Sequence, residues 1–161
     1  MSTRPETAEW CSACAEIAGK NSAPGGIIFD DGLWFVSHHT GLYTDPGELI
    51  AKTRRHCESL SDLTAGEAAA LGPLLGACVG AMTNVVVAER IYAASFNERV
   101  RHVHFLLLPR TAAMPRGHVI SDIYRRIRTE LRKVGLARNP TAQDRAAVAV
   151  RIRQELERGR L

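Results

Sequence analysis

The sequence has no uninterrupted apolar run of the length that a membrane span needs. Its longest apolar stretch, from Cys78 to Ala88, is interrupted by Gly, Thr and Asn, whereas a transmembrane helix needs roughly 20 mostly apolar residues. Residues 1–7 are not followed by the apolar segment that a secretory signal carries. We therefore predict a soluble, cytoplasmic protein that has no membrane partner.

Aromatic residues and cysteines are scarce as well. Only 6% of the 161 residues are aromatic and none follows Tyr124, so the C-terminal part lacks the stacking surfaces that single-strand nucleic-acid binders use. Four cysteines in a cytoplasmic chain are expected to be thiols or metal ligands rather than disulfides. With 45% apolar residues, the chain can bury one core of ordinary size.

The positive charge belongs to the tail. Residues 1–109 hold 8 Lys and Arg against 12 Asp and Glu, a net of −4, whereas residues 110–161 hold 13 against 5, a net of +8. We interpret this tail as a solvated helix surface, and the alternative is a surface for an anionic ligand or partner. Because no recognised nucleic-acid motif accompanies the charge, we do not expect a nucleic-acid partner.

Turn signals and apolar periodicity predict the elements of the first half. We expect a short helix over 8–19, a hairpin of 26–29 and 33–37 around Asp-Asp-Gly, and a third strand over 48–52. Thr64 with Glu67 three residues later is a capping-box pattern. It predicts a long helix that runs to about Val87 and kinks near Pro73.

The second half predicts two strands and two helices. Residues 91–96 and 102–108 are expected to pair antiparallel, and residues 119–135 and 142–159 to be helical. The predicted fold class is therefore α+β, with an antiparallel sheet of about five strands, the long helix packed on one face, and C-terminal helices. We divide the chain into a domain over 1–115 and a basic helical extension over 116–161.

The strand over 102–108 carries two imidazoles on one face. Successive strand residues point to opposite faces, so His102 and His104 lie on the same side. The ~3.3 Å rise per residue places them about 7 Å from each other. The opposite side carries Val103, Phe105 and Leu107 and must face the core. The spacing alone leaves a metal pair, a catalytic site and half-exposed histidines open.

A CxxC pair, Cys11 and Cys14, is the second signal. Two thiolates at this spacing can bind a tetrahedral zinc ion, which then needs two more ligands. A redox pair and two buried small residues are the other interpretations. The candidates for the two further ligands are His56 and His102, and the competing ones are His38, His39 and Cys57.

The sequence resembles the histidine-triad superfamily, whose signature is H-x-H-x-H followed by apolar residues and often Pro-Arg. The run from His102 to Arg110 matches this signature except at Leu106, which stands in place of the third histidine. The order of a CxxC helix, a hairpin, a Pro-Gly strand ending at a basic pair and His56, and a Leu-Thr-x-x-Glu helix is also the family's own. The resemblance covers about residues 10–118.

This resemblance implies a homodimer that binds a small-molecule nucleotide. In zinc-containing bacterial members, two cysteines, the histidine after the basic pair and the first motif histidine hold the metal. The ligands that the resemblance implies here are Cys11, Cys14, His56 and His102.

The resemblance also implies that His104 is the nucleophile, which attacks an α-phosphate and forms a nucleotidyl-imidazole intermediate. We expect a nucleotide hydrolase or nucleotidyl transferase acting on a phosphoanhydride or phosphoramidate bond. Amides at the start of the long helix or in the 97–101 loop, with Arg99 or Arg101, could stabilise the phosphate charge. The candidate substrate-binding residues are Asn97, Glu98, Arg99, His102 and Leu106.

Leu106 is the main departure from the family pattern. Losing one hydrogen-bond donor costs roughly 2.7–4 kcal/mol of transition-state stabilisation, so activity could fall about a hundredfold without being abolished. The alternative function is a nucleotide-binding module with structural zinc and weakened chemistry. A third hypothesis is a zinc-containing nucleic-acid binder that uses the basic tail.

Overall fold

A five-stranded antiparallel sheet forms the centre of the molecule. The structure is a computed structural model that describes residues 10–159, without the side chains of 118–122. The strands follow the spatial order β1-β2-β3-β5-β4, and each neighbouring pair is antiparallel. Their bounds are β1 (Ile27–Asp30), β2 (Trp34–His38), β3 (Leu49–Thr53), β4 (Arg90–Ala94) and β5 (His104–Arg110).

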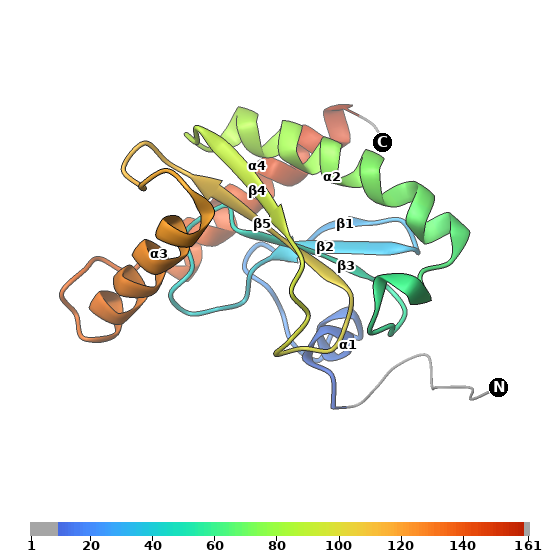
Figure 1. Cartoon of the computed structure of the whole chain (residues 1–161). Helices are drawn as coiled ribbons and strands as arrows, with labels where there is room; N and C mark the ends of the chain where they lie inside the picture. Colours follow the sequence, from blue (N-terminus) through green and yellow to red (C-terminus); the bar gives the residue numbers. More distant parts are fainter. Residues whose placement is uncertain (1–9, 160–161) are drawn as a thin grey trace.

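Helices α2 and α4 lie together on one face of this sheet, as Figure 1 shows, whereas α1 and α3 lie apart from them. This arrangement confirms the α+β class and the long helix packed on the sheet. The helices are α1 (Ser12–Ile17), α2 (Ala65–Val85), α3 (His118–Lys133) and α4 (Ala142–Gly159), and a 3₁₀ turn spans Leu60–Asp62.

The hairpin of β1 and β2 forms where the sequence predicts it. Gly32 adopts a φ of 85°, a conformation that costs glycine little because it has no Cβ. One carboxylate oxygen of Asp31 accepts the amide hydrogens of Leu33 and Trp34 at 2.9 and 2.7 Å. This turn directs the Trp34 side chain into the core, where it is fully buried.

Helix α2 begins at the predicted capping box. The hydroxyl oxygen of Thr64 accepts the amide hydrogen of Glu67 at 3.2 Å, and a Glu67 carboxylate oxygen accepts that of Thr64 at 2.7 Å. Two otherwise unpaired helix amides are thereby satisfied. The buried face of the helix packs Leu74, Cys78 and Met82 into the core.

The expectation that no stretch approaches the length of a membrane span was wrong for α2. By length and composition alone, Ala65–Val85 is long and apolar enough to cross a membrane. The reason is that no charged residue lies between Glu67 and Glu89, because the interrupting Gly, Thr and Asn residues are neutral. In the fold, this helix packs against β4 and α4.

The C-terminal helix α4 belongs to the same core as the sheet. Its side chains Ala149, Ile152 and Leu156 are buried in one cluster with residues of the strands and of α2. Thr141 and Asp144 form a capping box at its start, with bonds of 2.8 and 3.0 Å. The predicted bounds of this helix are confirmed.

The expectation of a solvated basic surface was wrong for part of the tail. Arg132 and Arg145 are both 6% exposed. Arg132 donates to the carbonyl oxygen of Tyr43 at 2.6 Å and pairs with Asp45, and Arg145 donates to the carbonyl oxygen of Leu42 at 2.9 Å. These arginines therefore hold the loop between β2 and β3.

Candidate functional site

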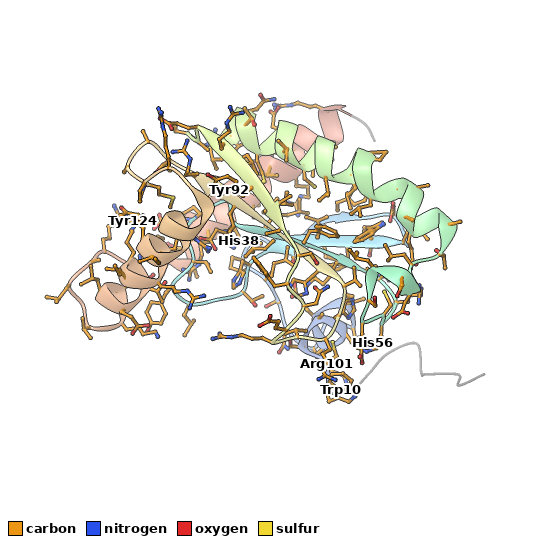
Figure 2. All side chains as sticks on the ribbon, viewed as in Figure 1. Trp10, His38, His56, Tyr92, Arg101 and Tyr124 are labelled. Atoms are coloured by element: carbon orange, nitrogen blue, oxygen red, sulfur yellow. The ribbon has the colours of Figure 1, made fainter. Side chains whose placement is uncertain are left out.

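Four side chains from distant parts of the chain form a buried cluster. Cys11 and Cys14 come from the start of α1, His56 follows β3, and His102 precedes β5. One ligand atom from each lies within 4.8 Å of all the others. Figure 2 shows His56 beside α1 and next to Trp10, whose ring packs edge-on against the imidazole at 5.3 Å. The cluster can hold a metal ion.

The spacing of the donors suits a tetrahedral zinc ion. The Nδ1 atom of His102 lies 3.5 Å from the sulfur of Cys11 and 3.6 Å from that of Cys14, and Nδ1 of His56 lies 3.4 Å from the Cys14 sulfur. Zn–S and Zn–N bonds of about 2.3 and 2.0–2.1 Å at tetrahedral angles place sulfur and nitrogen about 3.6 Å apart. Two thiolates and two imidazoles are also a donor set that zinc prefers.

The second nitrogen of each imidazole faces an acceptor. Nε2 of His102 donates to the carbonyl oxygen of Thr53 at 2.7 Å, and Nε2 of His56 lies 3.5 Å from a carboxylate oxygen of Glu58. Such contacts fix the tautomer that directs the Nδ1 lone pair at a metal. Burial lowers the pKa of His102 to about 4, so its ring is neutral and able to ligate near pH 7.

The competing ligands lie outside this cluster. His38 is buried beside the loop that follows β2, where its Nε2 accepts the amide hydrogen of Gly47 at 3.1 Å. His39 lines the pocket described below. The sulfur of Cys57 lies 3.4 Å from the hydroxyl of Thr53, and burial raises the pKa of this thiol.

The strand that carries the histidines begins two residues later than predicted. β5 starts at His104. His102 is completely buried, whereas the sequence predicted that it shares an exposed face with His104. The physical reason is that Val103 bonds to two segments, accepting from the Thr53 amide at 3.1 Å and donating to the Cys57 carbonyl at 2.8 Å. His102 is thereby held in the cluster and does not line the pocket.

The contacts of His104 determine which of its ring nitrogens carries the hydrogen and which carries the lone pair. Its Nδ1 lies 2.6 Å from the carbonyl oxygen of His102, and because a carbonyl can only accept, Nδ1 carries the hydrogen. A neutral imidazole then has its lone pair on Nε2. The backbone amide of His104 donates to the side-chain oxygen of Asn97 at 3.2 Å, which ties the 96–101 loop to the start of β5.

The side chain of His104 lies in a large pocket on the face of the sheet opposite α2 and α4. The pocket has a volume of about 1090 Å³ and lies between α1, the 96–101 loop and α3. Its wall from the sheet is mainly apolar and includes Ile50, Tyr92, Ala94, Leu106 and Leu108. Its ionisable side chains include Glu16, His39, Lys52, His104, Arg125 and Arg126.

Most of the predicted substrate-binding residues line this pocket. Asn97, Glu98, Arg99 and Leu106 do so, whereas Arg101 lines a separate, shallower depression beside Glu58. The start of α2 contributes no residue to the pocket within the described part of the chain. The suggested phosphate donors at that helix start therefore lie outside this pocket.

His39 is a pocket residue whose role the sequence analysis missed. Its Nδ1 accepts the amide hydrogen of Gly41 at 2.9 Å, so the ring hydrogen of the neutral form is on Nε2. Burial, and secondly the charge of Arg125, lower the pKa of His39 to about 4. A side chain at Gly41 would approach the His39 ring within 2.9 Å, so this close contact needs glycine.

Two further pocket residues, Lys52 and Glu16, were also missed. Lys52 donates to a carboxylate oxygen of Glu16 at 2.6 Å, and both side chains are nearly inaccessible to solvent. Burial lowers the pKa of Lys52, which the Glu16 carboxylate partly opposes. The signal available in the sequence was the placement of Lys52 on the same face of its strand as Ile50, in a segment that otherwise reads as apolar.

Solved structures of low sequence identity share this fold. The chain superimposes on a Hit-like protein involved in cell-cycle regulation from Bartonella henselae with a TM-score of 0.68, at 14% identity over 94% of this chain and 100% of that one. A Zn-bound histidine triad family protein from Mycobacterium smegmatis matches with a TM-score of 0.65, at 16% identity over 94% of this chain and 98% of that one.

A third solved structure has the same architecture. A hypothetical histidine triad nucleotide-binding protein from Sulfolobus tokodaii matches with a TM-score of 0.66, at 12% identity over 92% of this chain and 93% of that one. No family model and no curated protein matches the sequence. The comparisons show that the chain has the histidine-triad fold.

Proposed function

We propose that this chain is a zinc-containing nucleotide-binding protein of the histidine-triad type. In this proposal, Cys11, Cys14, His56 and His102 are the zinc ligands, and His104 cleaves a phosphoanhydride or phosphoramidate bond at an α-phosphate. The observation that carries the proposal is the His104 ring, which has Nδ1 bound to a carbonyl and lies in the pocket. The Zn-bound fold relative and the donor spacing support the metal.

The arrangement of His104 suits nucleophilic attack on phosphorus. Nε2 uses its lone pair to form a P–N bond while the bond to the leaving group breaks, and the leaving group departs with that electron pair. An amine leaving group also takes up a proton from solvent and leaves neutral. The ring then carries positive charge, which the His102 carbonyl stabilises through the Nδ1 hydrogen. Water afterwards attacks phosphorus and releases the imidazole. A bound zinc ion would fix the position of this carbonyl, because His102 is one of its ligands.

His104→Ala is expected to abolish turnover of an adenosine 5′-phosphoramidate. Intact-protein mass spectrometry of the wild type, quenched at alkaline pH, should show one added nucleotidyl group, since a P–N bond is acid-labile. The variant should show none, and Arg151→Ala on the exposed side of α4 should behave as the wild type. Turnover by His104→Ala at the wild-type rate would contradict the proposed mechanism.

A nucleotide-binding module without efficient chemistry is the second candidate. Leu106 favours it, because this side chain faces the pocket next to His104 and offers no hydrogen-bond donor. Calorimetry that detects AMP binding together with no turnover would support this function. A gain of turnover in Leu106→His would then attribute the loss to this position.

A further inference from the structure

Lys52 is the direct cross-strand neighbour of His104. The register of β3 and β5 places the two residues opposite each other, and opposite residues of an antiparallel pair have Cβ atoms about 4.5–5.5 Å apart on the same face. Both side chains line the pocket. The two residues therefore stand side by side on one face of the sheet, and Lys52, whose ammonium group pairs with Glu16 of α1, belongs to the wall of the pocket that holds the imidazole.

The Lys52 ammonium group has unused hydrogen-bond donors. It carries three N–H groups, and its only hydrogen-bond acceptor among the described residues is the Glu16 carboxylate at 2.6 Å. The ammonium also lies 5.2 Å from the centre of the Phe35 ring. The Lys52 side chain is 2% exposed, so the two remaining donors have little access to bulk water, and the side of Lys52 that a ligand can approach is the pocket wall.

Glu16 pairs with the Lys52 ammonium group through only one of its two carboxylate oxygens. One carboxylate oxygen accepts from Lys52, whereas the other is buried and has no partner within the described residues. A buried ion pair contributes little net stability, because desolvation of both charges offsets their attraction. A stabilising role alone therefore gives a weak account of this pair, whereas a cation beside a phosphate site has a clear chemical use.

Leu106 increases the need for such a cation. It is the next pocket-facing residue of β5 and pairs with Ile50, so this row of the sheet offers no hydrogen-bond donor from its side chains. We propose that Lys52, oriented by Glu16, donates to a non-bridging oxygen of the phosphoryl group that His104 attacks, and so replaces the charge stabilisation that Leu106 cannot provide. This inference rests on the proposed function.

The charge that develops in phosphoryl transfer explains the expected size of the effect. Negative charge spreads over the non-bridging oxygens, and a donor placed there in a site with little water commonly contributes about 10²–10³-fold to kcat. No proton or electron pair passes through Lys52, because it acts only as a fixed cation. A contact that strengthens in the transition state changes kcat more than KM.

The test compares Lys52→Met with the wild type in the zinc-loaded protein. With an adenosine 5′-phosphoramidate, Lys52→Met should lower kcat about a hundredfold or more while KM changes less than about fivefold. Lys52→Arg should recover part of the activity, since it keeps the charge. Lys133→Met, which removes an exposed ammonium group on α3, is the matched control and should leave kcat unchanged.

A purely structural ion pair makes a different prediction for the double variant Glu16→Leu/Lys52→Met. If the pair is purely structural, Lys52→Met lowers kcat only because it leaves the Glu16 charge buried and unpaired. Removing both charges would then give a folded, zinc-loaded protein with wild-type kcat. Our proposal predicts that kcat stays low, with zinc content and melting temperature close to wild type. Wild-type kcat in the double variant, or in Lys52→Met itself, would overturn the role of Lys52.

Binding separates this inference from the proposed catalysis. In calorimetry, Lys52→Met should weaken AMP binding about tenfold or more, a larger effect than on KM, because the AMP phosphate is a dianion near neutral pH whereas the phosphoramidate is a monoanion. Adenosine has no phosphate, and its binding should stay unchanged. If the wild type binds AMP without turnover, the catalytic proposal fails while this AMP-specific loss still supports Lys52. Equal AMP affinity in the variant and the wild type, or no AMP binding to either, overturns the inference.

Discussion

A single carbonyl group connects the buried cluster to the pocket. The backbone oxygen of His102 accepts from Nδ1 of His104 at 2.6 Å, while the ring of His102 lies among the sulfur atoms of Cys11 and Cys14. A displacement of His102 would therefore remove the contact that fixes the tautomer and direction of the His104 ring. The two histidines of the H-x-H pattern therefore have different surroundings, because His102 turns into the protein interior and His104 turns into the pocket.

Cys14→Ser is expected to remove the metal. The Cys14 sulfur lies next to both imidazoles of the cluster, so its loss should weaken zinc binding at least about a hundredfold, more than is typical when a residue that only hydrogen-bonds to a metal ligand is lost. The zinc content measured by elemental analysis should fall from one zinc per chain towards none, and turnover should fall with it. Cys78→Ala in the core of α2 should keep its zinc. One tightly bound zinc in Cys14→Ser would contradict the assigned ligand set.

At the start of α2, one residue, Glu67, joins three segments of the chain. Glu67 caps the helix with Thr64 and pairs with the guanidinium of Arg55 through two bonds of 2.8 Å. The backbone oxygen of Glu67 accepts from the Trp34 indole at 3.0 Å. The capping box could be predicted from the sequence, because its partners lie three residues apart. The bonds to Arg55 and Trp34 could not, because they depend on how distant segments pack.

Thr64→Ala is expected to lower the free energy of unfolding by about 0.5–2 kcal/mol. The substitution removes the hydroxyl that accepts the Glu67 amide hydrogen, and this amide, in the first turn of the helix, has no intrahelical acceptor to replace it. Urea denaturation followed by circular dichroism measures the change. Thr64→Ser keeps the hydroxyl and should lose less than half as much, so equal losses in the two variants would exclude the cap as the cause.

At the scale of the whole molecule, the basic extension is part of the fold. Helix α4 closes the core over the sheet, and α3 supplies Ile123 and Arg125 to the pocket. Arg125 pairs with the buried Glu48 at 3.0 Å. A boundary near residue 115 and a homodimer stay predictions. From its charge, the sequence predicted only that the extension is basic. That the extension packs into the fold could not be predicted, because the partners of its arginines are backbone carbonyls and acids about 80–100 positions away.

Ile152→Ala is expected to destabilise the protein by about 2–5 kcal/mol, as is typical when a large buried side chain leaves a cavity. Ile152 is fully buried in α4 and packs in the core cluster. The matched control is Ile127→Ala in α3, where the side chain is 55% exposed and the change should stay within about 0.5 kcal/mol. Chemical denaturation of both variants measures the difference, and a cost below 1 kcal/mol for Ile152→Ala would mean that α4 is an independent appendage.

The order of elements and the antiparallel pairs β1–β2 and β4–β5 could be predicted from the sequence itself, because turn residues, caps and apolar alternation act over a few positions. The grouping of Cys11, Cys14, His56 and His102 was implied by family resemblance, and the structure brings them together. Three features arose only from the packing of distant segments: the burial of His102, the pocket wall from α3, and Lys52 beside His104. Each depends on backbone register or on contacts across the sheet, and no local pattern of residues encodes those distances.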